Sequence, residues 1–339
     1  MRNSFLFVIN FLILRSVSKR RVSKDELRKG LPFFRMAALA AITGLGPASA
    51  QTEARWLAPG ADRVAALTYS PGECVSEAKH PGTDYLAEVG RAAFSSPFLL
   101  GGPAARGGLS CASCHVDGRS NPDFFLKGLS GAPGTADVTS SIFSRVRDDG
   151  VFNPVEIPSL AGVGKKTSFG ATAPMPSLHA FIGSAIADEF QGADPPAAVL
   201  EGLAAYIETM DAAFCPSAPV AMTPRRAMGD VVRTLAAARE ALIRNDAATA
   251  DFLLLSAQSA LGRIHARYPG PATGFLREQL QNLSLDLGSM RNLLRDHETV
   301  ESALDESSKR AMRLGKRLQQ ARRLSLYDPE RLRADEGEE

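Results

Sequence analysis

Apolar and polar positions alternate most regularly in the last third of the chain. Between residues 220 and 327, apolar residues recur three and four positions apart, which is the spacing of an amphipathic helix. Thr223-Pro224 and Asp246 are of the types that begin helices, and a Pro-Gly-Pro sequence at 269–271 is a clear break. We therefore expect four helices here, with short links that favour an antiparallel bundle or hairpin domain.

The third and fourth of these helices carry the strongest patterns. The third has a heptad seam at Leu276, Leu280, Leu283, Leu287, Met290 and Leu294. The fourth carries a basic run without acids, made of Lys309, Arg310, Arg313, Lys316, Arg317, Arg322 and Arg323. Such a run is either a solvated outer face or a surface that docks an acidic partner, so the helical domain is a candidate for protein docking or oligomerisation.

Residues 85–216 combine short helical patterns with long irregular sections. Helices are expected from Tyr85 to about Phe94, from Ser177 onward, and from Asp194, where the next residue is proline. Between residues 96 and 177 the chain is dense in Gly, Pro, Ser, Thr and Asn, which indicates loops. A loop section of this length is unusual unless the loops wrap a bound group that replaces part of the core.

The N-terminal residues 1–50 have the order of a secretory signal. Arg35 precedes a short apolar run, and Ala48-Ser49-Ala50 follows, which predicts cleavage before Gln51 and a periplasmic protein. The apolar run is too short for a stable transmembrane span. A second apolar stretch at residues 5–14 indicates either a start codon placed too early or a long leader or short anchor. Beyond the signal, residues 51–84 are expected to form loops, and residues 328–339 a disordered acidic tail.

Composition adds two constraints. The formal net charge is only +2, with 39 basic and 37 acidic residues, which gives no support for nucleic-acid binding. Four cysteines are present, and two of them, Cys74 and Cys215, lie far from the others. Export to an oxidising compartment makes a Cys74–Cys215 disulfide attractive.

The other two cysteines belong to Cys111-Ala112-Ser113-Cys114-His115, which has the C-x-x-C-H form of covalent haem attachment. Two thiols at this spacing match the two vinyl groups on one porphyrin edge, and the adjacent histidine reaches the iron. The alternatives are a thiol-exchange pair or half of a zinc site. The glycines before the motif do not form the strand that a thioredoxin-like motif follows, and no second pair of zinc ligands is near in the sequence.

Several segments resemble the bacterial di-haem cytochrome c peroxidase family over about residues 85–210. The similar segments are Gly90-Arg91-Ala92-Ala93-Phe94, Ser110-Cys111-Ala112-Ser113-Cys114-His115, Ile157-Pro158-Ser159-Leu160 and Leu203-Ala204-Ala205-Tyr206-Ile207. The last resembles the helix that closes many cytochrome c domains. The resemblance implies a cytochrome c-like haem domain at 85–216. Together with the helical domain that the periodicity predicts at 220–327, it gives an all-α protein.

The departures from that family bear on function. Its peroxidases carry two haems, whereas this chain has one C-x-x-C-H. The loop that usually carries aromatic and His or Trp-Asp-Gly residues reads Phe169-Gly170-Ala171-Thr172-Ala173-Pro174 here, so an acid–base pair for splitting a peroxide O–O bond is not visible. We therefore expect a periplasmic c-type cytochrome with one covalent haem that transfers electrons between redox protein partners. The alternative is a degenerate, peroxidase-like haem enzyme with an open distal site.

The sequence also suggests a role for individual residues of the expected haem site. Cys111 and Cys114 bind the haem and His115 ligates its iron, while Met175, held between two prolines, is the candidate sixth ligand. His179 is the second candidate, and an open or water-bound iron is the third possibility. Arg119 is a candidate donor to a haem propionate. Three carboxylates, Asp117, Asp123 and Asp137, give weak support for calcium.

Overall fold

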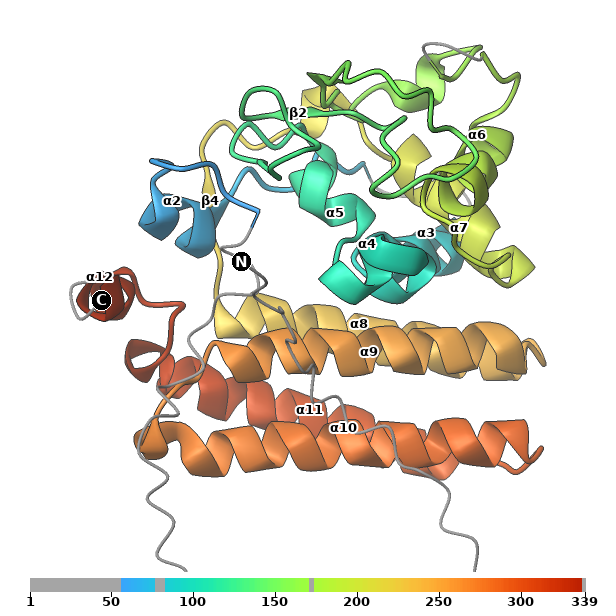
Figure 1. Ribbon diagram of the computed structural model, residues 1–339. Coiled ribbons are helices and arrows are strands. Elements are labelled where there is room, and N and C mark those ends of the chain that lie inside the picture. Colours follow the sequence, from blue (N-terminus) through green and yellow to red (C-terminus); the bar gives the residue numbers. More distant parts are fainter. Residues whose placement is uncertain (1–55, 77–82, 171–173, 337–339) are drawn as a thin grey trace, which may run out of the picture. The chain divides into compact units, whose positions relative to one another are not determined.

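Helices form most of the described part of the chain, and its strands make two short antiparallel pairs (Figure 1). The computed structural model describes residues 56–76, 83–170 and 174–336, so the predicted signal at 1–50 lies outside the described residues. Strand β1 (Tyr69–Ser70) pairs with β4 (Val220–Ala221), and β2 (Thr135–Ala136) pairs with β3 (Val155–Glu156). The all-α class is confirmed at this coarse level.

Four long helices occupy the C-terminal region, as the periodicity predicts. They are α8 (Pro224–Ile243), α9 (Ala247–Ala266), α10 (Gly274–Arg295) and α11 (Glu301–Gln320). Each packs against the next, and α11 packs back onto α8, which closes a four-helix bundle. The Thr223 hydroxyl and the Asp246 carboxylate accept backbone N–H bonds and cap α8 and α9. All of the predicted heptad residues except the half-buried Leu276 are buried.

Short elements fill the region from 83 to 216. The helical elements are α3 (Thr83–Phe94), η1 (Pro97–Leu99), α4 (Gly102–Gly107), α5 (Cys111–Cys114), η2 (Val116–Gly118), η3 (Val163–Lys165), α6 (Leu178–Ser184), the π-turn η4 (Ala185–Glu189), α7 (Ala197–Glu208) and η5 (Ala212–Phe214). Helix α6 begins directly after Ser177, close to the expected start, and the Ser177 hydroxyl accepts the Ala180 N–H and caps the helix. The expected start at Asp194 is wrong, because Pro196 disfavours helical backbone at Pro195, and the helix begins only after both prolines.

The two ends of the described chain contain more structure than the sequence predicts. Residues 63–68 form helix α2 (Arg63–Thr68) within the expected loop segment, and η6 (Pro271–Thr273) and η7 (Arg322–Leu324) flank α10 and α11. The tail that was expected to be disordered contains α12 (Pro329–Glu336). Leu332 of α12 is fully buried against Leu67 and Leu326, a contact between positions far apart in the sequence. Burial of this leucine stabilises a helix that its charged neighbours alone would not.

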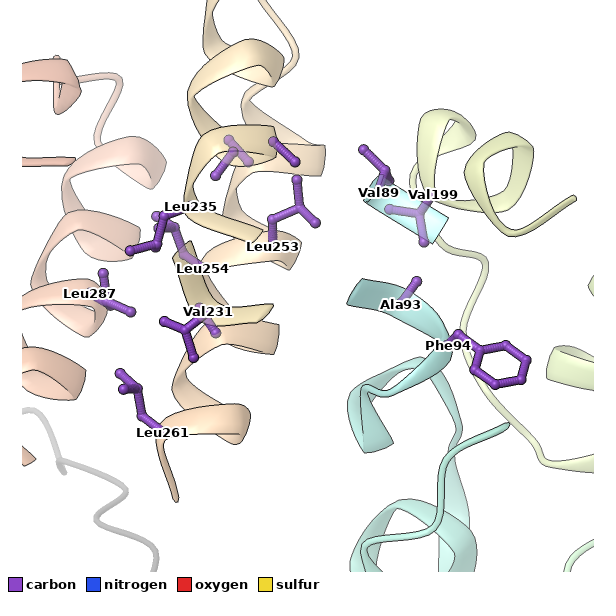
Figure 2. Packing of buried hydrophobic residues seen from close by; sticks show 14 of the residues in the cluster. Val89, Ala93, Phe94, Val199, Val231, Leu235, Leu253, Leu254, Leu261 and Leu287 are labelled. Carbon is purple, nitrogen blue, oxygen red and sulfur yellow. The ribbon is translucent and has the colours of Figure 1, made fainter. Parts of the chain in front are cut away.

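Helices α3 and α7 approach until their backbones touch. A Cβ on Gly90 of α3 would overlap the Gly202 carbonyl, and a Cβ on Gly202 would lie 2.6 Å from the Leu86 carbonyl oxygen. Next to this crossing, the rings of Phe94 and Tyr206 pack edge to face with centroids 5.5 Å apart. One buried cluster joins this pair of helices to the bundle, as Figure 2 shows with Val89, Val199, Leu235 and Leu253 among others.

We expect Gly90→Ala to lower the free energy of unfolding by about 3 kcal/mol or more, because the added methyl group meets backbone that cannot move aside. The matched control is Gly262→Ala in α9, where a Cβ has no neighbour within 4 Å and should stabilise by about 0.5–1 kcal/mol. Urea unfolding of both variants measures the difference. Similar changes in the two variants would contradict the close approach.

The Cys74–Cys215 disulfide is present, as predicted. It ties the segment before α3 to the segment after α7. Beside it, the Asp211 N–H donates to the Cys74 carbonyl at 2.7 Å and the Ser76 N–H donates to the Thr209 carbonyl at 2.9 Å. We refer to residues 69–76 as the N-terminal strap, because hydrogen bonds and the disulfide hold this segment against the end of α7.

Among the described residues, no helix has the length and apolarity needed to cross a membrane.

Candidate functional site

The Cys-Ala-Ser-Cys-His motif forms a single helical turn followed by a sharp change of direction. Ser110 precedes α5, and its side chain and that of Ser113 satisfy each other's backbone N–H groups in a capping box. The His115 N–H donates to the Cys111 carbonyl at 2.9 Å, and then His115 leaves helical geometry. The local sequence therefore places the two thiols three residues apart on one helical turn, with the imidazole directly after it.

The His115 ring is oriented by a hydrogen bond from a distant loop. Its Nδ1 lies 3.0 Å from the Pro158 carbonyl oxygen. A carbonyl only accepts hydrogen bonds, so Nδ1 carries the proton and Nε2 keeps a free lone pair. Burial lowers the pKa of His115 to about 4, so the ring is neutral at ordinary pH. A neutral imidazole held through Nδ1 is the usual arrangement of a metal-ligating histidine.

Both thiols of the motif are free and half-exposed. Burial by surrounding protein atoms raises the pKa of each, Cys111 and Cys114, to about 12. A thiol-exchange motif needs the opposite shift, because the thiolate is the nucleophile. Among the described residues, no three His, Cys, Asp or Glu side chains cluster.

Apolar side chains flank the motif on two sides. Cys111 and Ala112 pack against the large cluster that contains α3, α6 and α7, and Cys114 packs against a second, separate cluster. The second cluster consists of Leu100, Ala104, Leu109, Phe124, Leu129, Ala136, Phe143 and Ile157, with Trp56, Leu126 and Phe190 at its edge. A porphyrin is a large apolar plate, so a pair of thiols between two apolar clusters suits it.

Hydrogen bonds also fix the turn after His115. The Leu160 N–H donates to the Gly118 carbonyl at 2.9 Å, so the segment that orients the imidazole is bonded to this turn as well. Gly118 has a left-handed backbone, with a φ of +77°, and a Cβ there would overlap the sulfur of Met210. Met210 is 2% exposed and so lies in the core.

The candidate sixth ligands lie outside α5 and the turn that follows His115. Met175 is half-exposed and exchanges two backbone hydrogen bonds with Phe169, of 2.7 and 3.0 Å, while residues 171–173 between them fall outside the described residues. His179 is exposed on α6. The sixth ligand therefore stays a prediction.

The other predicted polar site residues are engaged elsewhere. Arg119 donates to the Pro71 carbonyl at 3.2 Å, so its role toward a propionate stays a prediction. Asp117 accepts from Arg226, and Asp137 accepts from the Thr139 hydroxyl. Among the described residues no three such donors cluster, and calcium stays a prediction.

Sequence reasoning missed a buried polar network beside the motif. The Glu189 carboxylate is 7% exposed and accepts from Arg147 Nη1 at 2.9 Å, and Arg147 Nη2 donates to the Ser184 hydroxyl at 2.6 Å. The negative charge of Glu189 adds to the raised pKa of both Cys111 and Cys114. Nothing in the spacing of these residues signals the network, because Arg147 and Glu189 are 42 positions apart.

This network predicts a pH dependence of stability. Burial raises the pKa of Glu189 from 4.5 to about 7, with Arg147 opposing the shift. Because the folded-state pKa is the higher one, the stability linked to Glu189 is complete below pH 4.5 and is lost as the pH rises through about 7. We expect Glu189→Gln to reduce the fall in unfolding free energy between about pH 5 and pH 8, measured by urea titration. Glu156→Gln, at an exposed carboxylate, is the control, and an equal fall in both variants would contradict the prediction.

Comparisons with known proteins give no relative: no family model, no curated protein and no solved structure matches this chain.

Proposed function

We propose that this protein is an exported c-type cytochrome with one covalent haem, which transfers electrons between redox partners. The observation that carries the proposal is the His115 imidazole, which is neutral and held through Nδ1 by the Pro158 carbonyl directly after two free thiols on one helical turn. These are the donor types, protonation state and spacing that haem attachment requires.

Each part of the site has a role in this proposal. Cys111 and Cys114 would hold one edge of the porphyrin through thioether bonds, and His115 Nε2 would ligate the iron. The bound haem would supply a one-electron iron couple. The two apolar clusters would limit water around it, and the Pro158 carbonyl would keep the imidazole in one orientation and raise its basicity.

The surrounding fold supports a cytochrome c-like domain. Helix α3 carries the Gly-Arg segment, and α7 carries the segment that resembles the closing helix of cytochrome c domains. The two helices cross at Gly90 and Gly202, with the Phe94–Tyr206 ring pair beside the crossing. Long loops connect them, as expected for a domain in which haem forms part of the core.

The disulfide supports an oxidising compartment, and with the predicted signal it favours the periplasm. The basic run of α11 gives less support for docking to an acidic partner. Arg310 pairs with Asp286, and Arg313 pairs with Glu306 at 2.8 Å, so part of the run is neutralised on the bundle itself. We therefore propose a redox protein as the partner and do not assign it a docking surface.

Spectra of the oxidised protein test the proposal and the sixth ligand together. The chain, expressed in a host that attaches haem, is expected to purify coloured and to show the weak far-red band of a methionine–iron bond. Met175→Ala should abolish that band, while Met222→Ala, at a half-buried methionine before α8, should keep it. A high-spin oxidised spectrum with rapid cyanide binding in the wild type would favour the peroxidase-like alternative, and a colourless protein would refute the proposal.

A further inference from the structure

The turn that follows His115 contains a strained residue. Asp117 has a left-handed backbone with a φ of +52°, a region that residues other than glycine rarely adopt. Its carboxylate Oδ2 accepts two hydrogen bonds, from the Gly72 N–H at 2.9 Å and from Arg226 Nη2 at 3.2 Å. Gly72 belongs to the N-terminal strap, whereas Arg226 belongs to the first turn of α8. The helical bundle therefore supports a residue two positions after the proposed iron ligand.

Arg226 is itself fixed in place. Its Nη1 donates to the Ser70 hydroxyl at 3.0 Å, and Ser70 lies in β1, which pairs with β4 just before α8. The side chains of Arg226 and Asp117 are 31% and 19% exposed, so solvent screens this pair less than a surface pair. The guanidinium thus joins three segments, namely the strap, the turn after His115 and α8.

A short chain of contacts leads from Asp117 to the imidazole. Gly118, the next residue, accepts the Leu160 N–H at 2.9 Å. Two residues before Leu160, the Pro158 carbonyl holds His115 Nδ1. A change in the backbone at Asp117 moves Gly118, and with it the segment that orients the ring. The sulfur of Met210, packed against Gly118, leaves little room for a compensating shift.

We propose that Arg226 is a positioning residue for the haem ligand: through Asp117 it holds the left-handed turn after His115 and so fixes the orientation of the imidazole. The inference rests on the proposed function, because it takes His115 as the iron ligand. It assigns the helical bundle a part in the redox centre, since the bundle provides the side chain that fixes the turn.

A matched control lies on the same helix. Arg233 of α8 pairs with Glu88 of α3 at 3.4 Å, so it also forms an ion pair between the bundle and the 85–216 domain. Its ion pairs are with Glu88 and Asp230, and they do not involve the turn after His115. Arg233→Gln therefore removes a comparable ion pair and reports the purely structural effect of weakening this interface.

The experiment compares Arg226→Gln, Arg226→Lys, Asp117→Gly and Arg233→Gln in the full haem-loaded protein. The readouts are the midpoint potential and hydrogen exchange of the amides at residues 115–119. Arg226→Gln should speed this exchange by about tenfold and shift the potential, and Arg226→Lys should restore part of both. Asp117→Gly keeps the left-handed backbone but removes the carboxylate, so it should shift the potential even if Arg226→Gln does not fold.

Arg233→Gln should leave the potential and the local exchange unchanged. The inference is overturned if Arg226→Gln and Asp117→Gly match Arg233→Gln in both readouts. Failure of the proposed function looks different, because the wild type would then carry no haem. Exchange at residues 115–119 in the haem-free variants would still show whether Arg226 holds the turn.

Discussion

Replacing both Cys111 and Cys114 by alanine is expected to abolish covalent haem attachment entirely. The exported chain should lose its visible absorption, and its intact mass under denaturing conditions should fall by one haem. The physical reason is that, in the proposed function, both thioether bonds form from these thiols, which are free and lie on one helical turn. Either single replacement leaves one thiol, so each should retain some covalent haem at reduced yield.

The chain provides a matched control for this loss. Cys74→Ala with Cys215→Ala also removes two cysteines, but these form the disulfide and take no part in attachment. This double variant should keep its colour and its haem mass. If the Cys111 and Cys114 double variant kept the full haem mass, the proposed function would be refuted. Loss of haem in both double variants would instead indicate a general failure of folding.

The Cys74→Ala, Cys215→Ala double variant is also expected to lose much of its free energy of unfolding. The Cys74–Cys215 disulfide closes a loop with a sequence separation of 141 residues, nearly the whole domain that holds the attachment turn. In the chain-entropy model, losing a cross-link over a loop of this length costs about 4–5 kcal/mol. The double variant should therefore unfold at a much lower urea concentration, with the bundle and the 85–216 domain affected together because they share one apolar cluster.

Reduction of the wild type gives an independent measurement. A thiol reductant opens the disulfide but leaves thioether bonds intact, so reduced wild type and the double variant should unfold at the same urea concentration. The backbone hydrogen bonds of the N-terminal strap with Asp211 and Thr209 do not need the disulfide. We therefore expect them in the reduced wild type and in the double variant alike. If the free energy of unfolding falls by less than about 1 kcal/mol, the N-terminal strap stays bound to α7 without the disulfide, which would contradict the prediction.

Much of the local structure was predictable from the sequence because its causes are local. Helix periodicity and capping depend on residues within a few positions of each other, so the sequence predicts the four bundle helices and their starts at Thr223 and Asp246 correctly. The Cys-Ala-Ser-Cys-His motif is equally local, since Cys111, Cys114 and His115 lie within one turn. The predicted helix start at Asp194 is wrong because Pro196 disfavours helical backbone at Pro195, so α7 begins only at Ala197.

The tertiary structure decided what depends on residues distant in the sequence. The Pro158 carbonyl that orients His115, the Arg147–Glu189 pair and the Arg226–Asp117 pair join positions 43, 42 and 109 apart. Burial of Leu332 turned an expected disordered tail into α12. Periodicity and spacing report short-range preferences, whereas these contacts exist only once the chain has folded. The sequence alone thus determined which atoms could bind a haem, and the fold determined the imidazole's orientation and protonation and the residues that hold its turn.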